Sequence, residues 1–448
     1  MFGIIKKGYF FIRQSIAFYP TLIMTSFIVL SILALLLEYS AWGQQFKEHY
    51  PFLIVGDAVT ARTILGTLIG GIISITVFSF TMVMIVMNQA SSYYSQKLSH
   101  RYVEEKPSQI VLGFYVGSII FCMVLLFRIS DYERVLNIPS LGILMATLFG
   151  IGSILMFIYF INYISKSIEL FNVVTKIHQK TAAELKKLAE TSTEISRNTE
   201  EVRRLVDGHQ WHTYESDRSG YFQNVQEKEL IKLAAKKDLI FKMDVVFGTY
   251  VVKGTPLFSA TQKIDLNTED WKNLYAAFGF YVGEKIGENL FYGFRQISEI
   301  AVKALSSGIN DPAAAIFCID HLKDLYALKM QKSRNDLFLG DDGKVRLITR
   351  PVSFDELFYM VISPLRFYGK ADVLVMASLL ELIKFLAYLD REQRLYKNTL
   401  NKHLKMIIHD ADRSIPNKTD RDVLKSAVYE LMSFHGYFYL NAAEIRDF

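Results

Sequence analysis

The residues with the clearest chemical potential lie in one uncharged stretch of 34 residues, Thr63 to Gln96. A helix over this stretch brings small and polar side chains close to one face. Two large apolar side chains interrupt that face, so the set reads Thr67, Ser74, Phe78, Thr81, Ile85 and Asn88. Such a face either holds helices together by close packing and hydrogen bonds, or lines a water-filled path with Phe78 or Ile85 as its constriction.

Basic residues stand at both ends of this stretch. Arg62 precedes it, and Lys97 and Arg101 follow it, with no acidic residue in between. If several copies of the chain surround a path, these side chains form positive rings at its mouths, and positive rings favour anions. Nearby acidic residues weaken this preference, namely Asp57, Glu104 and Glu105.

Sequence motifs for enzyme chemistry are missing. The chain has no phosphate-binding Gly-x-x-x-x-Gly-Lys-Ser/Thr loop, no His-Glu-x-x-His and no Gly-x-Ser-x-Gly. His209 and His212 could ligate a metal only with partners from elsewhere, and Cys122 and Cys318 are too few for a cysteine zinc site. We therefore expect no catalytic residue, no metal and no cofactor, and the net charge of +5 gives no reason to expect nucleic acid as a partner.

A second polar motif is Asn310-Asp311-Pro312. It predicts the start of a helix, because Asp311 can accept from the free N–H groups while Pro312 takes the first helical position without losing a hydrogen bond. The functional alternative is an anion or ligand bound at those N–H groups. Arg295 and Glu299, four residues apart, predict a structural ion pair on the preceding helix.

The distribution of charge predicts the elements that position these residues. Residues 1–164 carry only 17 charged side chains, against 78 in the remaining 284 residues. The first part contains four charge-free windows, each longer than the roughly 20 residues with which a helix crosses about 30 Å of hydrocarbon. We predict a transmembrane domain over residues 1–164, with helices near 18–37, 64–88, 110–128 and 141–163.

The loops predict the orientation of these helices. Lysine and arginine gather before the first helix, after the second and after the fourth, and are fewer in the other two loops. The positive-inside rule then places the N- and C-termini in the cytoplasm. Tyr39, Trp42 and Tyr50 lie at the outer interface in this orientation, where amphipathic rings are favoured.

The helical pattern continues past the fourth span. Over residues 165–207, apolar residues recur at intervals of three or four, with lysine, glutamate and threonine between them. We predict a helical stalk, for which two arrangements remain open. The stalk pairs with another copy of the chain, or it lies on its own domain.

The rest of the chain predicts an α+β region. Residues 208–265 read as a small β-rich module with one helix at 226–237 and strands at 219–225, 238–246, 249–253 and 257–261. Residues 266–448 are mainly helical, with one hairpin at Asp342-Gly343 and a capping box of Ser353 with Glu356. The helices are expected at about 268–283, 288–307, 370–390, 392–412 and 419–434. The fold class is thus a four-helix transmembrane domain plus a cytosolic α+β domain.

Three groups of residues carry a resemblance to a known family. They are Thr60-Ala61-Arg62-Thr63-Ile64-Leu65, the runs 219–223 and 248–257, and the segment from Gly293-Phe294-Arg295-Gln296-Ile297 to Ala304-Leu305-Ser306-Ser307-Gly308-Ile309-Asn310-Asp311-Pro312. Over nearly its whole length the chain resembles bacterial predicted membrane proteins known as domain of unknown function 2254. It departs from them at Tyr93-Tyr94-Ser95-Gln96-Lys97, where the family usually has a Pro-Arg pair, and at Ser307, where it usually has proline. The resemblance implies a multi-pass protein of the bacterial inner membrane and implies no activity.

The polar face of the second helix supports one main hypothesis of function. We expect a channel-like conduit for ions or small solutes, with a cytosolic domain that gates or senses. Four helices make a narrow bundle, so the conduit requires several copies of the chain, a homo-oligomer embedded in the lipid bilayer. The alternative is a non-conducting, membrane-anchored sensor or assembly scaffold, whose cytosolic ligand or protein partner the sequence does not identify.

Overall fold

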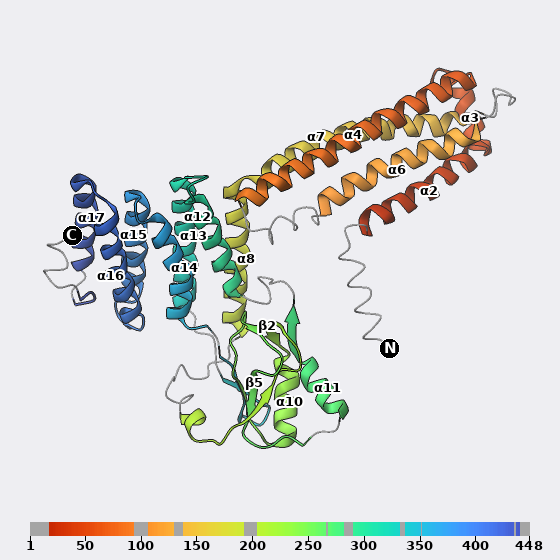
Figure 1. Cartoon of the computed structure of the whole chain (residues 1–448). Helices are drawn as coiled ribbons and strands as arrows, with labels where there is room; N and C mark the ends of the chain where they lie inside the picture. The colour runs from red at the N-terminus through yellow and green to blue at the C-terminus, as the bar shows by residue number, and fades with distance from the viewer. Residues whose placement is uncertain are drawn as a thin grey trace. The chain divides into compact units, whose positions relative to one another are not determined.

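The structure is a computed structural model of the 448-residue chain, and its contacts divide the chain into two compact units, Met1–Glu169 and Leu170–Phe448. The first is the membrane unit, and the second is the C-terminal unit. Figure 1 traces both along the chain, and each is described by itself. The structure describes residues 18–93, 106–129, 138–191, 204–265, 268–281, 290–331, 337–350, 352–433 and 436–439.

Among the described residues of the membrane unit, four helices are long and apolar enough to cross a bilayer, as predicted. They are α2 (Phe18–Glu38), α4 (Ala58–Tyr93), α6 (Lys106–Arg128) and α7 (Ser140–Ile168). Helices α6 and α7 each pack against the other three long helices. The shared core consists of large apolar side chains, among them Phe27, Phe121 and Leu125.

A short helix that was not predicted follows the first span. Helix α3 (Ala41–His49) begins at Ser40, whose hydroxyl accepts from the backbone N–H of Gly43 at 3.1 Å. A 3-10 turn, η1 (Pro51–Leu53), then leads toward α4. At nine residues, α3 is too short to cross a membrane and too polar to give a hydropathy signal, so a search for long apolar windows misses it.

The predicted stalk is divided between the units. Helix α7 ends at Ile168, and Glu169 has a ψ of 121°, which is not helical. Helix α8 (Leu170–Thr191) then packs against α12 (Leu290–Ala304) and α13 (Pro312–Gln331) of its own unit. Its apolar stripe of Val173, Val174, Ile177 and Leu185 is buried. Helix α8 thus lies on its own domain, which is one of the two arrangements left open, and residues 192–203 of the predicted stalk are outside the described part.

The strands of the C-terminal unit form two small sheets. The order in the larger sheet is β1-β5-β3-β8-β7, with β3 and β8 parallel and the other pairs antiparallel, and the smaller sheet is antiparallel in the order β4-β2-β6. A single core of Phe222, Phe258, Phe278 and neighbouring apolar residues includes side chains from both sheets. The strands are β1 (His212–Glu215), β2 (Gly220–Val225), β3 (Phe241–Met243), β4 (Tyr250–Val251), β5 (Pro256–Ala260), β6 (Phe278–Tyr281), β7 (Leu337–Leu339) and β8 (Val345–Ile348).

The β-rich module is larger than the 208–265 segment expected. The predicted hairpin exists as β7 and β8, turns at Gly343 with a φ of 69°, and joins the larger sheet through β3. The helix expected over 268–283 ends early, because α11 (Thr268–Ala276) gives way to strand β6. Residues 278–281 form a strand because they pair with β2, and the sequence pattern of this one segment does not predict that pairing.

The remaining helices stack in order. The α12–α13 pair contacts α14 and α15, which in turn contact α16 and α17, and Figure 1 shows these helices as a row. Ser353 and Glu356 form the predicted capping box at the start of α14. The fold class is confirmed as four apolar helices followed by an α+β region. This unit also contains α10 (Glu227–Lys237), α14 (Phe354–Gly369), α15 (Val373–Leu389), α16 (Lys397–Ser414) and α17 (Lys418–Met432).

Candidate functional site

Helix α4 has two opposite faces. Its core face carries Ala61, Leu65, Ile72 and Val83, which are buried where α4 packs on α6 and α7. At about 100° per residue, Ser74 and Thr81 lie roughly half a turn away from that core face. We call the side that carries Thr67, Gly70, Ser74, Thr81 and Asn88 the outward face of α4.

All six predicted path-lining residues are exposed on this single chain. Thr67, Ser74, Thr81 and Asn88 are exposed, and the side chains of Phe78 and Ile85 are 51% and 55% exposed. Phe78 also touches its own protomer, since its ring lies edge-on to Phe157 of α7 with centroids 5.7 Å apart. The helix thus brings the predicted residues together on one side, and the other three transmembrane helices do not cover them.

Three glycines of α4, on the outward face or beside it, have room around them. A Cβ atom added to Gly66, Gly70 or Gly71 would meet no other atom within 4 Å. By contrast, a Cβ on Gly150 of α7 would lie 2.5 Å from the side chain of Leu68. Gly66, Gly70 and Ser74 lie four residues apart and form a row of small residues, and the described part of the protomer does not pack against the two glycines.

The hydroxyl groups on this face need no external partner, which corrects one expectation. Thr67 donates to the Thr63 carbonyl at 2.7 Å, Ser74 to Gly70 at 2.9 Å and Thr81 to Val77 at 2.9 Å. Hydrogen bonds to the preceding turn satisfy serine and threonine inside a helix. The sequence argument that a polar strip in lipid must meet water or another helix is thus too strong for these three residues.

The predicted mouth charges are placed only in part. Arg62 lies in the first turns of α4 and is partly exposed. Lys97 and Arg101 lie outside the described residues. The structure therefore provides the position of one of the two expected basic rings and no geometry for the other.

A buried carboxylate in the membrane unit was not predicted from the sequence. Glu38 ends α2, and its carboxylate accepts from the backbone N–H groups of Ser140 and Leu141 at 2.9 and 3.0 Å, so it caps α7. The same carboxylate forms an ion pair with Lys47 of α3, and the Glu38 side chain is 0% exposed. Three elements are held by one buried carboxylate. The only sequence signal was an acidic residue directly after an apolar run.

The Asn310-Asp311-Pro312 motif forms the predicted helix start. Asp311 Oδ1 accepts from Ala314 N–H at 3.1 Å, Pro312 is the first residue of α13, and Asn310 takes a φ of 50°. Because the Asp311 carboxylate itself accepts from the first turn, it occupies the place that a bound anion would take. Arg295 Nε and Glu299 Oε1 are 3.4 Å apart, as their spacing predicts.

The geometry offers no metal centre in the part of the chain that is described. Within those ranges, no group of three or more His, Cys, Asp or Glu side chains is arranged to hold an ion. His209 and His212 are both exposed, and His209 Nδ1 is 2.8 Å from the Leu205 carbonyl oxygen.

Fold and site together define an integral membrane protein with four spanning helices and a mainly helical α+β C-terminal unit. Residues 13–384 match the family described as predicted membrane protein (DUF2254), and the chain belongs to that family. It is similar to uncharacterized proteins of Mycobacterium tuberculosis and Mycobacterium bovis, with 22% identity over 391 residues, which cover 83% of this chain and 71% of each relative. No solved structure matches the chain.

Proposed function

We propose that copies of this chain associate through the outward face of α4, and that this face lines a passive path for ions or small solutes across the bacterial inner membrane. We further propose that both termini lie in the cytoplasm, as the positive-inside rule predicts. No catalytic step is part of this proposal.

One observation carries the proposal, namely the difference between the exposed faces of α4 and α7. The exposed side chains of α7 include Leu148, Ile151, Ile154, Leu155 and Ile158, all large and apolar, as lipid contact favours. The exposed surface of α4 also has large apolar residues, among them Val77, Phe78 and Ile85, but its outward face combines them with Thr67, Gly70, Ser74, Thr81 and Asn88. Small residues allow helix backbones to approach closely, so this composition supports contact with another copy rather than with lipid chains.

A path must then form between copies. The contacts inside one membrane unit are made by packed apolar side chains such as Phe121, Leu125 and Tyr115, which favours a solid bundle. Around a symmetry axis, Phe78 and Ile85 supply the narrowest apolar ring, and Arg62 supplies positive charge at one mouth. This arrangement favours anions over cations.

The C-terminal unit is the proposed gating element. Helix α8 follows α7 after Glu169 alone, and it is fixed to its own unit through α12 and α13. His178 Nε2 of α8 lies 2.6 Å from Asp324 Oδ2 of α13, which adds a polar contact to the apolar stripe. A change in the C-terminal unit can therefore reach the end of the last transmembrane helix through one residue.

The second candidate function is a non-conducting assembly scaffold or sensor. The back-bonded hydroxyls of Thr67, Ser74 and Thr81 favour it, because a dry contact between two α4 helices leaves none of them unsatisfied. The two candidates share the same surface and differ in whether water reaches it.

Cysteine accessibility distinguishes them. Both native cysteines are buried, and burial raises the pKa of the Cys318 thiol above its usual range. We therefore expect the native cysteines to react little with a charged thiol reagent. In sealed vesicles, Ser74→Cys should react with a small charged reagent, whereas the lipid-facing control Leu155→Cys should not. Ser74→Cys that resists the reagent but forms a disulfide with a second copy favours the scaffold. Failure of both reactions contradicts association through this face.

Conductance in planar bilayers tests the path itself. Phe78→Ala should raise the conductance, because it widens the proposed constriction. Phe157→Ala is the matched control, since it removes the same ring contact from α7 without changing the α4 face. Equal effects of the two substitutions would assign Phe78 to packing, and a reversal potential that indicates cation selectivity would reject the anion preference.

A further inference from the structure

Helix α3 and the 3-10 turn η1 that follows it carry a row of neighbouring aromatic rings. Trp42 and Phe46 stack with centroids 5.6 Å apart, Phe46 and Tyr50 are 5.0 Å apart, and Tyr50 and Phe52 are 6.2 Å apart. Trp42 is 60% exposed and Phe52 is 79% exposed. We call Trp42, Phe46, Tyr50 and Phe52 the aromatic row.

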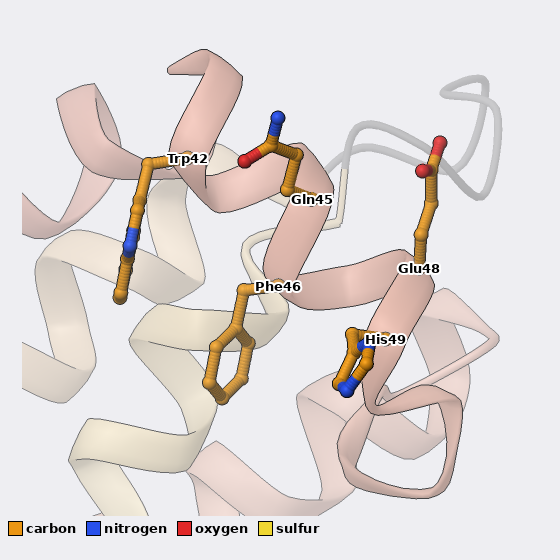
Figure 2. Close-up of a pocket in the computed structure, with 5 residues that line it drawn as sticks. All are labelled: Trp42, Gln45, Phe46, Glu48 and His49. Atoms are coloured by element: carbon orange, nitrogen blue, oxygen red, sulfur yellow. The ribbon is translucent and has the colours of Figure 1, made fainter.

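The two sides of α3 differ in chemistry. Figure 2 shows Trp42, Phe46 and His49 pointing to one side of the helix, the side on which the bodies of the transmembrane helices lie, while Gln45 and Glu48 point to the other. These five residues line an open hollow of about 500 Å³. A short helix with rings on one side and polar groups on the other is the form that lies in the plane of a membrane surface.

The orientation of α3 is fixed by contacts on a third side. Lys47 forms its ion pair with the buried Glu38 carboxylate. A Cβ at Gly43 would lie 2.2 Å from the Leu37 carbonyl oxygen, so only glycine permits this close approach to the end of α2. The helix therefore cannot roll to hide its rings against its own bundle without breaking these contacts.

The neighbouring surface is that of the membrane helices. Leu36 and Leu37 at the end of α2 and Val59 at the start of α4 are exposed apolar residues that flank α3 along the chain. Tyr39 lies beside them, and the Arg128 guanidinium is 6.0 Å from its ring centroid. The aromatic row thus continues the lipid-facing surface at the depth where amphipathic rings are favoured.

We propose that α3 is a lipid-docking helix whose aromatic row inserts at the boundary between headgroups and acyl chains of one leaflet. Four crossings place it at the membrane surface opposite the one at which α7 ends. The occupant of this surface is phospholipid, and Gln45 and Glu48 face water. The inference is independent of whether α4 lines a path, because it concerns the position of α3 alone.

Fluorescence quenching in proteoliposomes tests the proposal. The chain has three tryptophans, Trp42, Trp211 and Trp271, so the difference between the native chain and Trp42→Phe isolates the emission of Trp42. Lipids brominated on the upper acyl chain should quench most of that emission, while aqueous iodide should quench little of it. Strong quenching by iodide and none by brominated lipid would overturn the proposal.

Paired cysteines on α3 provide the second measurement. In sealed vesicles of the orientation that exposes α3, Glu48→Cys should react quickly with a charged maleimide, and Phe46→Cys should be slower by an order of magnitude or more. Equal reactivity would place the whole helix in water. Protection of Phe46→Cys without quenching of Trp42 by brominated lipid would mean that protein, such as a second copy, covers the row, and would also overturn the proposal.

Discussion

The glycines of α6 and of α4 show how one residue type serves two regions of the same membrane unit. A Cβ at Gly117 of α6 would lie 2.8 Å from the Phe27 ring, and one at Gly113 would lie 3.0 Å from the Pro20 backbone. At Gly66, Gly70 and Gly71 of α4 the same atom would meet nothing within 4 Å. The first group lets α2 approach α6, and the second leaves a surface open. Only the tertiary structure shows whether a row of small residues already packs against a helix of its own protomer or is exposed.

Polar groups show the same contrast between regions. The exposed hydroxyls of α4 donate to their own helix and are satisfied. In the C-terminal unit, His403 of α16 is 0% exposed, lies against Phe358 with ring centroids 4.8 Å apart, and makes no hydrogen bond with either ring nitrogen. The exposed hydroxyls of α4 are thus hydrogen-bonded, whereas the buried ring nitrogens of His403 are not. His403 is therefore the residue that should affect the free energy of unfolding.

Overpacking the α2–α6 contact should have the largest effect. Gly117→Leu forces a side chain into the Phe27 ring, and we expect it to destabilise the membrane unit by about 3 kcal/mol or more, or to prevent folding. The matched control Gly66→Leu adds its Cβ where no other atom lies within 4 Å, so it should not lower the thermal unfolding midpoint in detergent. Equal loss of stability in both variants would contradict the distinction between used and open glycines.

Acidification should have the next largest effect, through His403. Burial lowers the pKa of His403 from 6.5 to about 4, with smaller effects of Asp355, which raises it, and of Lys402 and Arg366, which lower it. Between these values the unfolded chain binds a proton that the folded chain excludes, so stability is complete above pH 6.5 and is lost as the pH falls toward 4. The total loss is about 3 kcal/mol, at roughly 1.4 kcal/mol for each unit of pKa.

Denaturant titrations of the full chain at pH 7 and pH 5, followed by near-ultraviolet circular dichroism, measure the part of this loss that occurs above pH 5, about 2 kcal/mol. His403→Leu should abolish its share of the pH dependence and be neutral or stabilising at pH 7, because it removes two buried nitrogen atoms that lack partners. An unchanged pH dependence in His403→Leu would show that other groups cause the loss.

Substitution of Gly70, an exposed glycine of α4, should have the smallest effect on the free energy of unfolding. It should also change the association of copies. Gly70→Leu replaces a poor helix former on an uncovered face, so we expect the folded protomer to gain up to about 1 kcal/mol. If a second copy packs there, the side chain should also weaken association, which light scattering in mild detergent would detect. A stable oligomer of unchanged size in Gly70→Leu would exclude close packing at this position.

Local chemistry made a large part of the fold predictable. The four spans follow from long windows without charge, and the starts of α13 and α14 follow from Asp311 with Pro312 and from Ser353 with Glu356. The sequence also placed the polar residues of α4 on one face, because helical periodicity alone determines which side chains share a side.

Features that depend on distant contacts were not predictable. Strand β6 exists because it pairs with β2, and the hairpin of β7 and β8 joins a sheet whose other strands lie far away in the sequence. In the sequence, Glu38 marks only the end of an apolar run. In the structure, its carboxylate contacts Lys47 and the first N–H groups of α7. No pattern within a single segment predicts these strand pairings and side-chain contacts.

The sequence by itself determined that the chain spans a membrane four times and that α4 carries a polar face, since hydrocarbon tolerates only long uncharged helices and a helix repeats about every 3.6 residues. Only the tertiary structure showed that this face is turned away from α6 and α7. It also showed that Lys47 of α3 forms an ion pair with Glu38, and that α8 packs on its own unit. The reason is physical: a helix fixes which residues share a side, but the packing of its neighbours fixes what that side meets.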